Sequence, residues 1–282
     1  MLQLFTSYWV HHIDPFALKF PEGLFLEKFG IEGIRWYGIA YLLGFVAAAV
    51  MLRLYYKKAR SPLNTDAQTD LLTYIILGTV IGGRLGYMLL YDFAGFIANP
   101  LTLFNLQQGG MASHGGMLGI FLALLIYSRR HQIEVLKLTD ILVTIGPIGL
   151  CFGRIANFIN GELYGKPASV PWAIIFPNND PLAIPRHPSQ LYEAVLEGIV
   201  LTVYLQIRFW RTNSDARTRT GVLSGEFLIG YALLRTIGEC FREPDAPLIL
   251  NLSRGTFFSL FMLIAGIGLI VRSKRKVTAA KS

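Results

Sequence analysis

The chain has 282 residues, of which 53% are hydrophobic and 16% are charged. Soluble globular domains contain about 25% charged residues, so this composition argues against a soluble protein. The formal net charge of +8 would suit nucleic acid or an anionic surface. Most of the basic residues, however, lie in short runs between apolar blocks, as membrane orientation signals do, which argues against nucleic-acid binding.

The N-terminal segment, residues 1–33, does not follow the pattern of a signal peptide. It lacks a basic start followed by an apolar core, and it carries His11, His12, Asp14 and two prolines. We expect this segment to form an amphipathic arm at the membrane surface.

Apolar blocks of about 17–22 residues follow, which is the length needed to cross a hydrocarbon core of roughly 30 Å. They predict seven transmembrane helices, at residues 34–52, 71–91, 111–128, 138–159, 189–209, 222–241 and 255–271. The expected fold class is therefore an all-α integral membrane protein, a seven-transmembrane-helix bundle. We expect one membrane domain, residues 1–282, with helices 1–4 in residues 34–159 and helices 5–7 in residues 188–272.

Basic residues predict how this bundle is oriented. The connections after the first, third, fifth and seventh blocks, with the basic tail at 273–282, carry most of the 26 lysines and arginines. By the positive-inside rule the C-terminus is cytoplasmic and the N-terminus lies outside. The longest outer connection, residues 160–187, is rich in proline but contains Trp172 and Phe176, which predicts a small extracytoplasmic cap with side chains to bury.

Three arginines fall inside predicted helices: Arg84, Arg154 and Arg235. A charge inside a bilayer costs several kcal/mol unless it faces a partner or a wet cavity. The direction of each helix, with a rise of about 1.5 Å per residue, puts all three arginines in the outer half of the membrane. Agreement between three separate helices predicts one site at that depth.

Polar side chains at a similar depth surround these arginines in the predicted bundle. Helical spacing puts several on shared faces of the fifth and sixth helices; the set is Tyr37, His114, Asn157, Gln190, Glu193, Glu197, Tyr231, Glu239 and Arg242. Structural alternatives stay open, because Arg235 and Glu239 could form a structural ion pair and Glu193 could neutralise an arginine. Three or four arginines against two or three acids leave surplus positive charge. That surplus predicts an anionic ligand, and arginine forks favour the phosphate of an outer-leaflet phospholipid.

The two cysteines, Cys151 and Cys240, lie inside apolar blocks and are expected to be small buried residues. Two isolated thiols cannot form a structural zinc site. The sequence has neither a paired-histidine site nor a phosphate-binding loop, so it predicts no metal and no cofactor.

Six strings of residues carry a resemblance to a known family. They are Arg35-Trp36-Tyr37-Gly38, Gly82-Gly83-Arg84-Leu85-Gly86-Tyr87, Gly109-Gly110-Met111-Ala112-Ser113-His114-Gly115-Gly116, Gly153-Arg154-Ile155-Ala156-Asn157, Arg186-His187-Pro188-Ser189-Gln190 and, from Tyr231 and Arg235 onward, Phe241-Arg242-Glu243-Pro244-Asp245. In this order they resemble the prolipoprotein diacylglyceryl transferase family over nearly the whole chain. That family has a seven-helix fold with its N-terminus outside and its C-terminus inside, in agreement with the distribution of basic residues.

The resemblance implies an enzyme of the bacterial cytoplasmic (inner) membrane. Such enzymes move a diacylglyceryl group from phosphatidylglycerol to the lipobox cysteine thiol in the signal peptide of a preprolipoprotein. They release glycerol phosphate, and the reaction is the first step of lipoprotein maturation. Family positions tied to activity or substrate binding match Tyr37, His114, Arg154, Asn157, Glu162, Tyr231, Arg235 and Glu239.

These inferences give a set of expected site residues. We assign catalytic roles to His114, Arg154, Arg235 and Tyr231, and substrate binding to Tyr37, Arg84, Asn157, Asn160, Glu162, Gln190, Glu193, Glu239 and Arg242. The arginines are expected to stabilise charge on the departing phosphate. His114 is expected to accept the proton of the thiol, whose ordinary pKa is about 8.5, or alternatively to bind substrate.

Two departures from the family pattern and three rival functions remain. Thr256 stands where the family usually has glutamine, and the cap is shorter than in the longer members.

One rival function is that of a lipid or anion transporter, which predicts charged residues continuing to the cytoplasmic face. The others are a non-catalytic relative that binds phosphatidylglycerol and an enzyme that uses the same lipid with a non-peptide acceptor.

Overall fold

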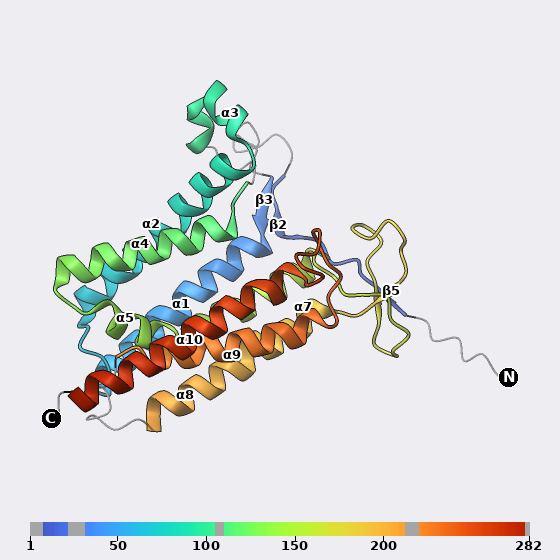
Figure 1. The fold of residues 1–282 in the computed structure, drawn as a ribbon. Coiled ribbons are helices and arrows are strands. Elements are labelled where there is room, and N and C mark those ends of the chain that lie inside the picture. The colour runs from blue at the N-terminus through green and yellow to red at the C-terminus, as the bar shows by residue number, and fades with distance from the viewer. Residues whose placement is uncertain (1–7, 22–31, 105–109, 212–219, 280–282) are drawn as a thin grey trace. The chain divides into compact units, whose positions relative to one another are not determined.

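The computed structural model describes residues 8–21, 32–104, 110–211 and 220–279, most of which are helical (Figure 1). The long helices are α1 (Trp36–Lys57), α2 (Thr65–Leu90), α4 (Ser113–His131), α9 (Val222–Glu239) and α10 (Arg254–Ala279). Shorter ones are α3 (Phe93–Ala98), the 3₁₀ helix η2 (Pro100–Phe104), α5 (Val135–Leu142), α6 (Gly146–Ile159), α7 (Ser189–Glu193), the π-helical segment η3 (Ala194–Val200) and α8 (Leu201–Arg211).

Helical structure covers each of the seven segments that the apolar blocks predict, but two of them are irregular. The fourth consists of α5 and α6, which are bent by 49° at a short break. Pro147 lies in the first turn of α6, where its missing N–H and fixed φ suit a helix start and prevent continuation from α5. The fifth runs through α7, η3 and α8 without interruption.

Three described helices are long and apolar enough to cross a membrane: Trp36–Lys57, Thr65–Leu90 and Arg254–Lys274. The bent pair formed by α5 and α6 gives a fourth if it counts as one broken span. The expectation of a helical membrane protein is therefore confirmed.

The expectation of an all-α chain was incomplete, because the described residues also form short strands. β1 (Trp9–Val10), β4 (Ile174–Ile175) and β5 (Pro185–Arg186) form one sheet in the order β1-β4-β5. β2 (Phe16–Lys19) and β3 (Gly33–Arg35) form a two-stranded ribbon leading into α1. Strands of two to four residues show too little alternation to be recognised in a sequence.

Isolated bridges extend the first sheet as far as the end of α9. Pro167 pairs with Arg186, and Gly165 pairs with Arg242, both antiparallel. The amides of Lys166 and Glu243 donate across the second bridge, to Phe241 and Tyr164 respectively. We call this series of paired segments, from Trp9 through the cap to Arg242, the cap ladder. It gives the N-terminal segment a partner, because Trp9 pairs with Ile174.

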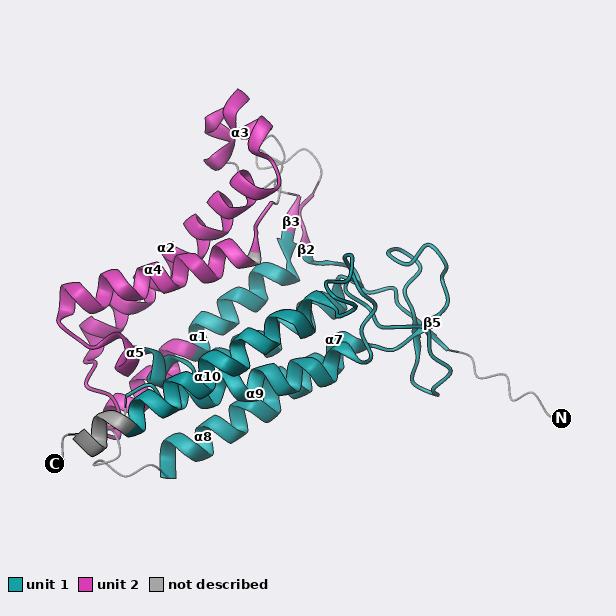
Figure 2. Ribbon diagram, viewed as in Figure 1, with its two compact units in different colours: residues 1–17, 34–47, 139–282 teal, residues 18–33, 48–138 magenta. Residues whose placement is uncertain are grey.

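The chain divides into two compact units (Figure 2). Unit 1 comprises residues 1–17, 34–47 and 139–282, and unit 2 comprises residues 18–33 and 48–138.

Glycines allow α2 and α4 to approach closely within unit 2. A side chain at Gly82 would begin 2.4 Å from the carbonyl oxygen of Gly115, and one at Gly119 would begin 1.9 Å from that of Gly78. Close backbone approach through small residues is typical of helix pairs in membranes. This packing fixes the first turn of α4, which carries His114.

In unit 1 the start of α9 is fixed by a residue of α5. Asp140 accepts hydrogen bonds from the amides of Gly221 and Ser224, each at 2.7 Å, and from the Ser224 hydroxyl at 2.6 Å. Gly221 has φ +93, a left-handed conformation that favours glycine. Because the first amides of a helix have no partner within it, Asp140 caps the helix that carries Tyr231, Arg235 and Glu239.

Candidate functional site

Arg154 lies in the second half of α6, and it binds two fully buried glutamates. Its Nε and Nη2 atoms lie 3.2 and 3.0 Å from Oε2 of Glu197, and its Nη1 atom lies 3.0 Å from Oε2 of Glu193. Both glutamate side chains are 0% exposed. Isolated charges so deeply buried would be very costly, so the ion pairs are what make the arrangement possible.

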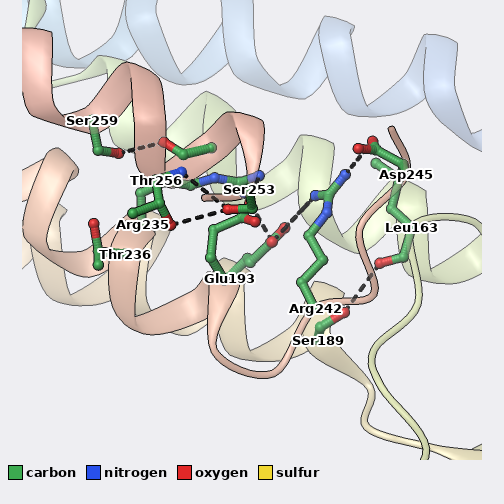
Figure 3. A network of polar contacts seen from close by, with 12 residues as sticks. Leu163, Ser189, Glu193, Arg235, Thr236, Arg242, Asp245, Ser253, Thr256 and Ser259 are labelled. Atoms are coloured by element: carbon green, nitrogen blue, oxygen red, sulfur yellow. Dashed lines mark hydrogen bonds and ion pairs between the residues drawn. The ribbon is translucent and has the colours of Figure 1, made fainter. Parts of the chain in front are cut away.

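Arg235 on α9 binds the same two acids from another helix, and Figure 3 shows it beside Glu193. Its Nη1 atom lies 2.8 Å from Oε1 of Glu193 and 3.1 Å from Oε1 of Glu197. Its Nη2 atom pairs with Glu239, one turn further along α9. The ion pair between Arg235 and Glu239, which the helical spacing left open as a structural alternative, is present, and it is part of a larger network.

Arg242 lies three residues beyond the end of α9 and joins this network through Glu193. Its Nη1 atom lies 3.2 and 3.3 Å from the two oxygens of Glu193, and its Nη2 atom lies 2.9 Å from Oδ2 of Asp245 (Figure 3). The cap ladder holds the backbone of the same residue through the bridge to Gly165. Both the side chain and the backbone of Arg242 are thus fixed.

The seven charged residues of this network form what we call the arginine cluster: Arg154, Glu193, Glu197, Arg235, Glu239, Arg242 and Asp245. The sequence count indicated surplus positive charge at the site. Within the described cluster that surplus is absent, because each of the three arginines is paired and Asp245 supplies an acid that the count omitted. An added anion would therefore have to compete with a carboxylate already in place.

Tyr37, Asn157 and Glu162 form a second polar group in unit 1. The Tyr37 hydroxyl donates to Oε1 of Glu162 at 2.8 Å, and Nδ2 of Asn157 donates to the same oxygen at 2.8 Å and to the Tyr37 hydroxyl oxygen. Tyr37 opens α1, whereas Asn157 is on α6 and Glu162 follows it. Three residues predicted to bind substrate are therefore in contact.

Gln190 and Asn160 lie next to this group. Nε2 of Gln190 donates to the backbone carbonyl of Glu162 at 2.7 Å, and the carbonyl of Asn160 accepts from Asn179 at 2.7 Å. The side-chain oxygens of Gln190 and Asn160 are buried without a hydrogen-bond partner among the described residues. Buried acceptors of this kind are uncommon, and both belong to the predicted set of site residues.

Tyr231 is one helical turn before Arg235 on α9. It lies within electrostatic range of Glu197, Arg154 and Arg235, and its ring stacks on Phe227 with centroids 6.0 Å apart. The stripe predicted for the sixth helix is therefore present, with its tyrosine beside the arginine cluster.

The start of α10 packs against the same cluster. A side chain at Gly255 would begin 2.2 Å from Oε1 of Glu239 and 2.9 Å from Nε of Arg235, so it would force these two side chains to shift. Thr256 donates its amide to the Ser253 hydroxyl at 3.2 Å, and the two hydroxyls lie 3.0 Å apart. Ser253 therefore caps α10, and Thr256 lies in the first turn of this helix, near Arg235 (Figure 3).

The cap contains a buried ion pair that sequence reasoning missed. Nε and Nη2 of Arg186 lie 2.6 and 2.9 Å from the two oxygens of Asp180, and Nη1 reaches Glu243 at 3.4 Å. The hydrogen bonds from Arg186 hold the pKa of Asp180 below its ordinary value. An acid six positions before an arginine in an irregular loop carries no periodic signal, so the pairing could not be read from spacing.

Arg84 and His114 belong to unit 2. Arg84 is buried, and it donates from Nε to the carbonyl of Leu103 at 3.1 Å, from Nη2 to that of Thr102 at 2.5 Å and from Nη1 to that of Gly110 at 3.0 Å. These three partners are carbonyls of the described residues that precede α4. His114 is the second residue of α4 and is exposed.

The expectation that both cysteines are small buried residues was wrong, because neither of them is fully buried. Cys151 is half-buried, whereas Cys240, just after α9, is exposed. Both thiols are free. The apolar block predicted for the sixth helix ends at residue 241, but α9 ends at Glu239, which leaves Cys240 outside the helix.

The chain is similar to known proteins over most of its length. Residues 26–272 match the family described as prolipoprotein diacylglyceryl transferase. A phosphatidylglycerol–prolipoprotein diacylglyceryl transferase from Rhodospirillum rubrum is 46% identical over 266 residues, which cover 92% of this chain and 96% of the relative. Proteins of the same name from Coxiella burnetii and Pseudoalteromonas translucida are 47% and 42% identical, over 90% and 93% of this chain and 93% and 97% of their own.

Proposed function

The chain belongs to the prolipoprotein diacylglyceryl transferase family, and from that membership we propose that it transfers the diacylglyceryl group of phosphatidylglycerol to a cysteine thiol of a prolipoprotein. The names of its relatives state both substrates. The acceptor is the lipobox cysteine of the signal peptide. The products are a thioether and glycerol phosphate, and the reaction is the first step of bacterial lipoprotein maturation.

The same proposal includes the arrangement in the bacterial inner membrane. Residues 1–282 form one membrane domain of seven spans, with the N-terminus outside, the C-terminus in the cytoplasm and residues 160–187 as an extracytoplasmic cap. Helices at all seven predicted segments and the distribution of lysine and arginine support this arrangement. It puts the arginine cluster in the outer half of the bilayer.

The chemistry requires a bond exchange at a primary carbon of the glyceryl group. The bond from this carbon to a phosphate oxygen breaks, and the oxygen keeps the electron pair. The thiol sulfur forms the new bond to the carbon and loses its proton. Negative charge therefore grows on the departing phosphate in a poorly hydrated place, where preplaced cations lower the barrier most effectively.

Arg154 and Arg235 are the cations that we assign to this role. The observation that carries the assignment is that both are held in place by the same buried pair, Glu193 and Glu197. A guanidinium fixed before the reaction needs no reorganisation as charge develops. Tyr231 lies beside both arginines and is assigned to the same reacting centre.

Substrate binding is assigned to the remaining polar residues of unit 1 and to Arg84. Tyr37, Asn157 and Glu162 offer a hydroxyl, an amide and a carboxylate in mutual contact, and these groups suit the glycerol hydroxyls of the headgroup. Gln190 and Asn160 contribute buried oxygens that can accept hydrogen bonds. Glu193, Glu239 and Arg242 are assigned to the substrate-binding part of the site as members of the arginine cluster, where the two acids set the charge and position of the arginines that meet the phosphate.

His114 is assigned as the base that accepts the thiol proton. A histidine has an ordinary pKa of about 6.5, so its neutral form can accept a proton near neutral pH. The test is turnover of His114→Gln with lipid and peptide both saturating. Near-full turnover would remove the base assignment and leave substrate binding as the role of His114.

The experiment that tests the function is a transfer assay in liposomes containing phosphatidylglycerol. One lipobox peptide carries cysteine, and a matched control peptide carries serine. Cysteine-dependent lipidation with an equal amount of glycerol phosphate released is the expected result. Folded protein that binds the lipid but forms no product would contradict the proposed reaction and favour a non-catalytic relative.

A further inference from the structure

The acids of the arginine cluster are of two kinds. Glu193 binds all three arginines and Glu197 binds two, and both side chains are 0% exposed. By contrast, Glu239 pairs with Arg235 alone and Asp245 pairs with Arg242 alone among the described residues. We call the first two the inner acids and the other two the outer acids.

The outer acids occupy equivalent atoms on two adjacent arginines. The Nη1 atoms of Arg235 and Arg242 both reach Oε1 of Glu193, at 2.8 and 3.2 Å, so these two guanidinium groups are neighbours. The Nη2 atoms of the same arginines carry Glu239 and Asp245, respectively. Figure 3 shows Glu193 between Arg235 and Arg242, with Asp245 on the far side of Arg242.

The inner and the outer acids contribute differently to the net charge of the arginine cluster. The inner acids bind several arginines each and balance all but one of the positive charges on Arg154, Arg235 and Arg242. A phosphodiester carries one negative charge and would complete that balance. With the outer acids also in contact, the cluster has no positive charge left for a phosphodiester.

We propose that Glu239 and Asp245 are internal substitutes for the substrate phosphate: their carboxylates occupy Nη2 of Arg235 and Arg242 until phosphate oxygens replace them. This inference rests on the proposed function. Carboxylate and phosphate oxygens accept hydrogen bonds from a guanidinium edge in the same geometry, so one can take the place of the other. The inner acids stay bound and keep the arginines in position.

The two outer acids differ in how easily a phosphate can displace their carboxylates from the arginines. The Asp245 side chain is 57% exposed, so water can solvate its carboxylate when phosphate displaces it. The Glu239 side chain is buried against Gly255 at the start of α10, so its carboxylate competes more strongly. Removing the charge of either acid, while keeping its shape, should therefore strengthen phosphate binding.

The test is the affinity of the full-length protein for dihexanoyl-phosphatidylglycerol, measured by titration calorimetry without peptide so that no transfer occurs. Asp245→Asn should tighten binding about threefold, the size expected for an exposed ion pair. Glu239→Gln should tighten binding more, by about tenfold, because its pair is buried. Glu193→Gln should weaken binding, since the arginines lose their common partner.

Matched controls separate competition at the arginines from other effects. Glu226→Gln removes an acid that pairs with Arg208 elsewhere in unit 1 and should leave the affinity unchanged. Dihexanoylglycerol lacks the phosphate and should bind all variants equally, whereas glycerol phosphate should follow the pattern of the lipid. Equal tightening toward dihexanoylglycerol would show that the acids do not compete with phosphate, and would overturn the inference.

The decisive contrary result is unchanged or weaker lipid binding in Asp245→Asn with the melting temperature of the wild type. Because Asp245 is exposed, this variant keeps the inference testable even if Glu239→Gln does not fold. That result would contradict the inference but not the proposed function, provided that the wild type transfers lipid to the cysteine peptide. Absence of transfer in the wild type would contradict the proposed function instead.

Discussion

Tyr37 donates a hydrogen bond of 2.8 Å to Glu162, although 125 positions separate the two residues in the chain. The contact joins the first turn of α1 to the segment that follows α6. Asn157 completes it by donating to both partners. A tyrosine that opens a membrane helix is commonly an interfacial anchor, but this one has a half-buried carboxylate and an amide as specific partners.

Tyr37→Phe should therefore reduce transfer with little loss of stability. The change removes one donor to Glu162 and one acceptor for Asn157, and hydrogen bonds to charged groups contribute about 1.5–3 kcal/mol. If that energy is used in the transition state, turnover falls about 10–100-fold. The measurement is the transfer assay together with thermal unfolding in detergent.

Tyr41→Phe is the matched control for that variant. Tyr41 is one turn further along α1, with its ring centroid 6.2 Å from that of Tyr37, and it is exposed. Its substitution should leave turnover unchanged. Equal activity of Tyr37→Phe and Tyr41→Phe would assign Tyr37 to the interfacial belt.

Arg235→Lys should lose most activity while the protein still folds. An ammonium keeps the charge but cannot bind Glu193, Glu197 and Glu239 at once as the guanidinium does. Removing a preplaced group that stabilises developing charge typically costs about 10²–10³ in turnover. The assay is single turnover with saturating lipid and peptide.

Arg208→Lys is the control for Arg235→Lys, because Arg208 forms an arginine fork with a carboxylate outside the arginine cluster. Arg208 binds both oxygens of Glu226, so the substitution disrupts a comparable pair in unit 1. It should change stability but not turnover. Unchanged turnover in Arg235→Lys would remove Arg235 from stabilisation of the leaving group.

Gly165→Ala should weaken both the cap and the reaction. The added Cβ would lie 2.5 Å from the carbonyl oxygens of His187 and Phe241, so the bridge to Arg242 would have to open. Arg242 would then lose its backbone support, and lipid affinity should fall with turnover. Gly149→Ala on α6 meets nothing within 4 Å and should retain both properties; equal behaviour of the two variants would contradict a role for the cap ladder.

The contact of the N-terminal segment with the cap should depend on pH through His11. This residue is buried against Phe158 and Phe176, and burial lowers its pKa below the ordinary value. The folded state then binds protons less readily than the unfolded segment, so the contribution to stability is complete at higher pH and decreases as pH falls below about 6.5. Protonation should release the segment.

Hydrogen exchange at the His11 amide reports this release directly, because that amide donates to the carbonyl of Ile175 at 2.8 Å. After correction for intrinsic rates, protection should fall between pH 7 and 5 in the wild type. His11→Phe keeps an aromatic ring and should hold its protection across this range, whereas His12→Gln should behave as the wild type. Protection independent of pH in the wild type would contradict the prediction.

Helix positions could be predicted because long apolar blocks leave few alternatives. The residues facing one another could be predicted where helical spacing applies, as for Tyr231, Arg235 and Glu239 on α9. Glu197 shares a helix face with Glu193, so helical spacing predicted it among the polar residues of the site. Its two arginine partners, Arg154 and Arg235, are known only from the structure. Surface and site acids cannot be distinguished by spacing alone.

Contacts made by irregular segments could not be predicted. Asp245 follows Pro244 outside any helix, and its pairing with Arg242 depends on the turn between them. Arg84 donates to three backbone carbonyls among the described residues, and every residue has a carbonyl, so no residue type signals those contacts. The short strands of the cap ladder are specified by their partners, which lie far away in the sequence.

The cap ladder also has a consequence for the order of folding. Trp9 pairs with Ile174, and Gly165 pairs with Arg242, so each pairing waits for a segment made much later during synthesis. Contacts between distant segments form slowly because the entropy of closing a large loop must be lost first. The N-terminal strand therefore remains without its partner while α1, α2 and α4 are made, and Arg242 acquires its backbone support only near the end of synthesis. A nascent chain that stops before α9 has the inner acids but only one of their three arginines.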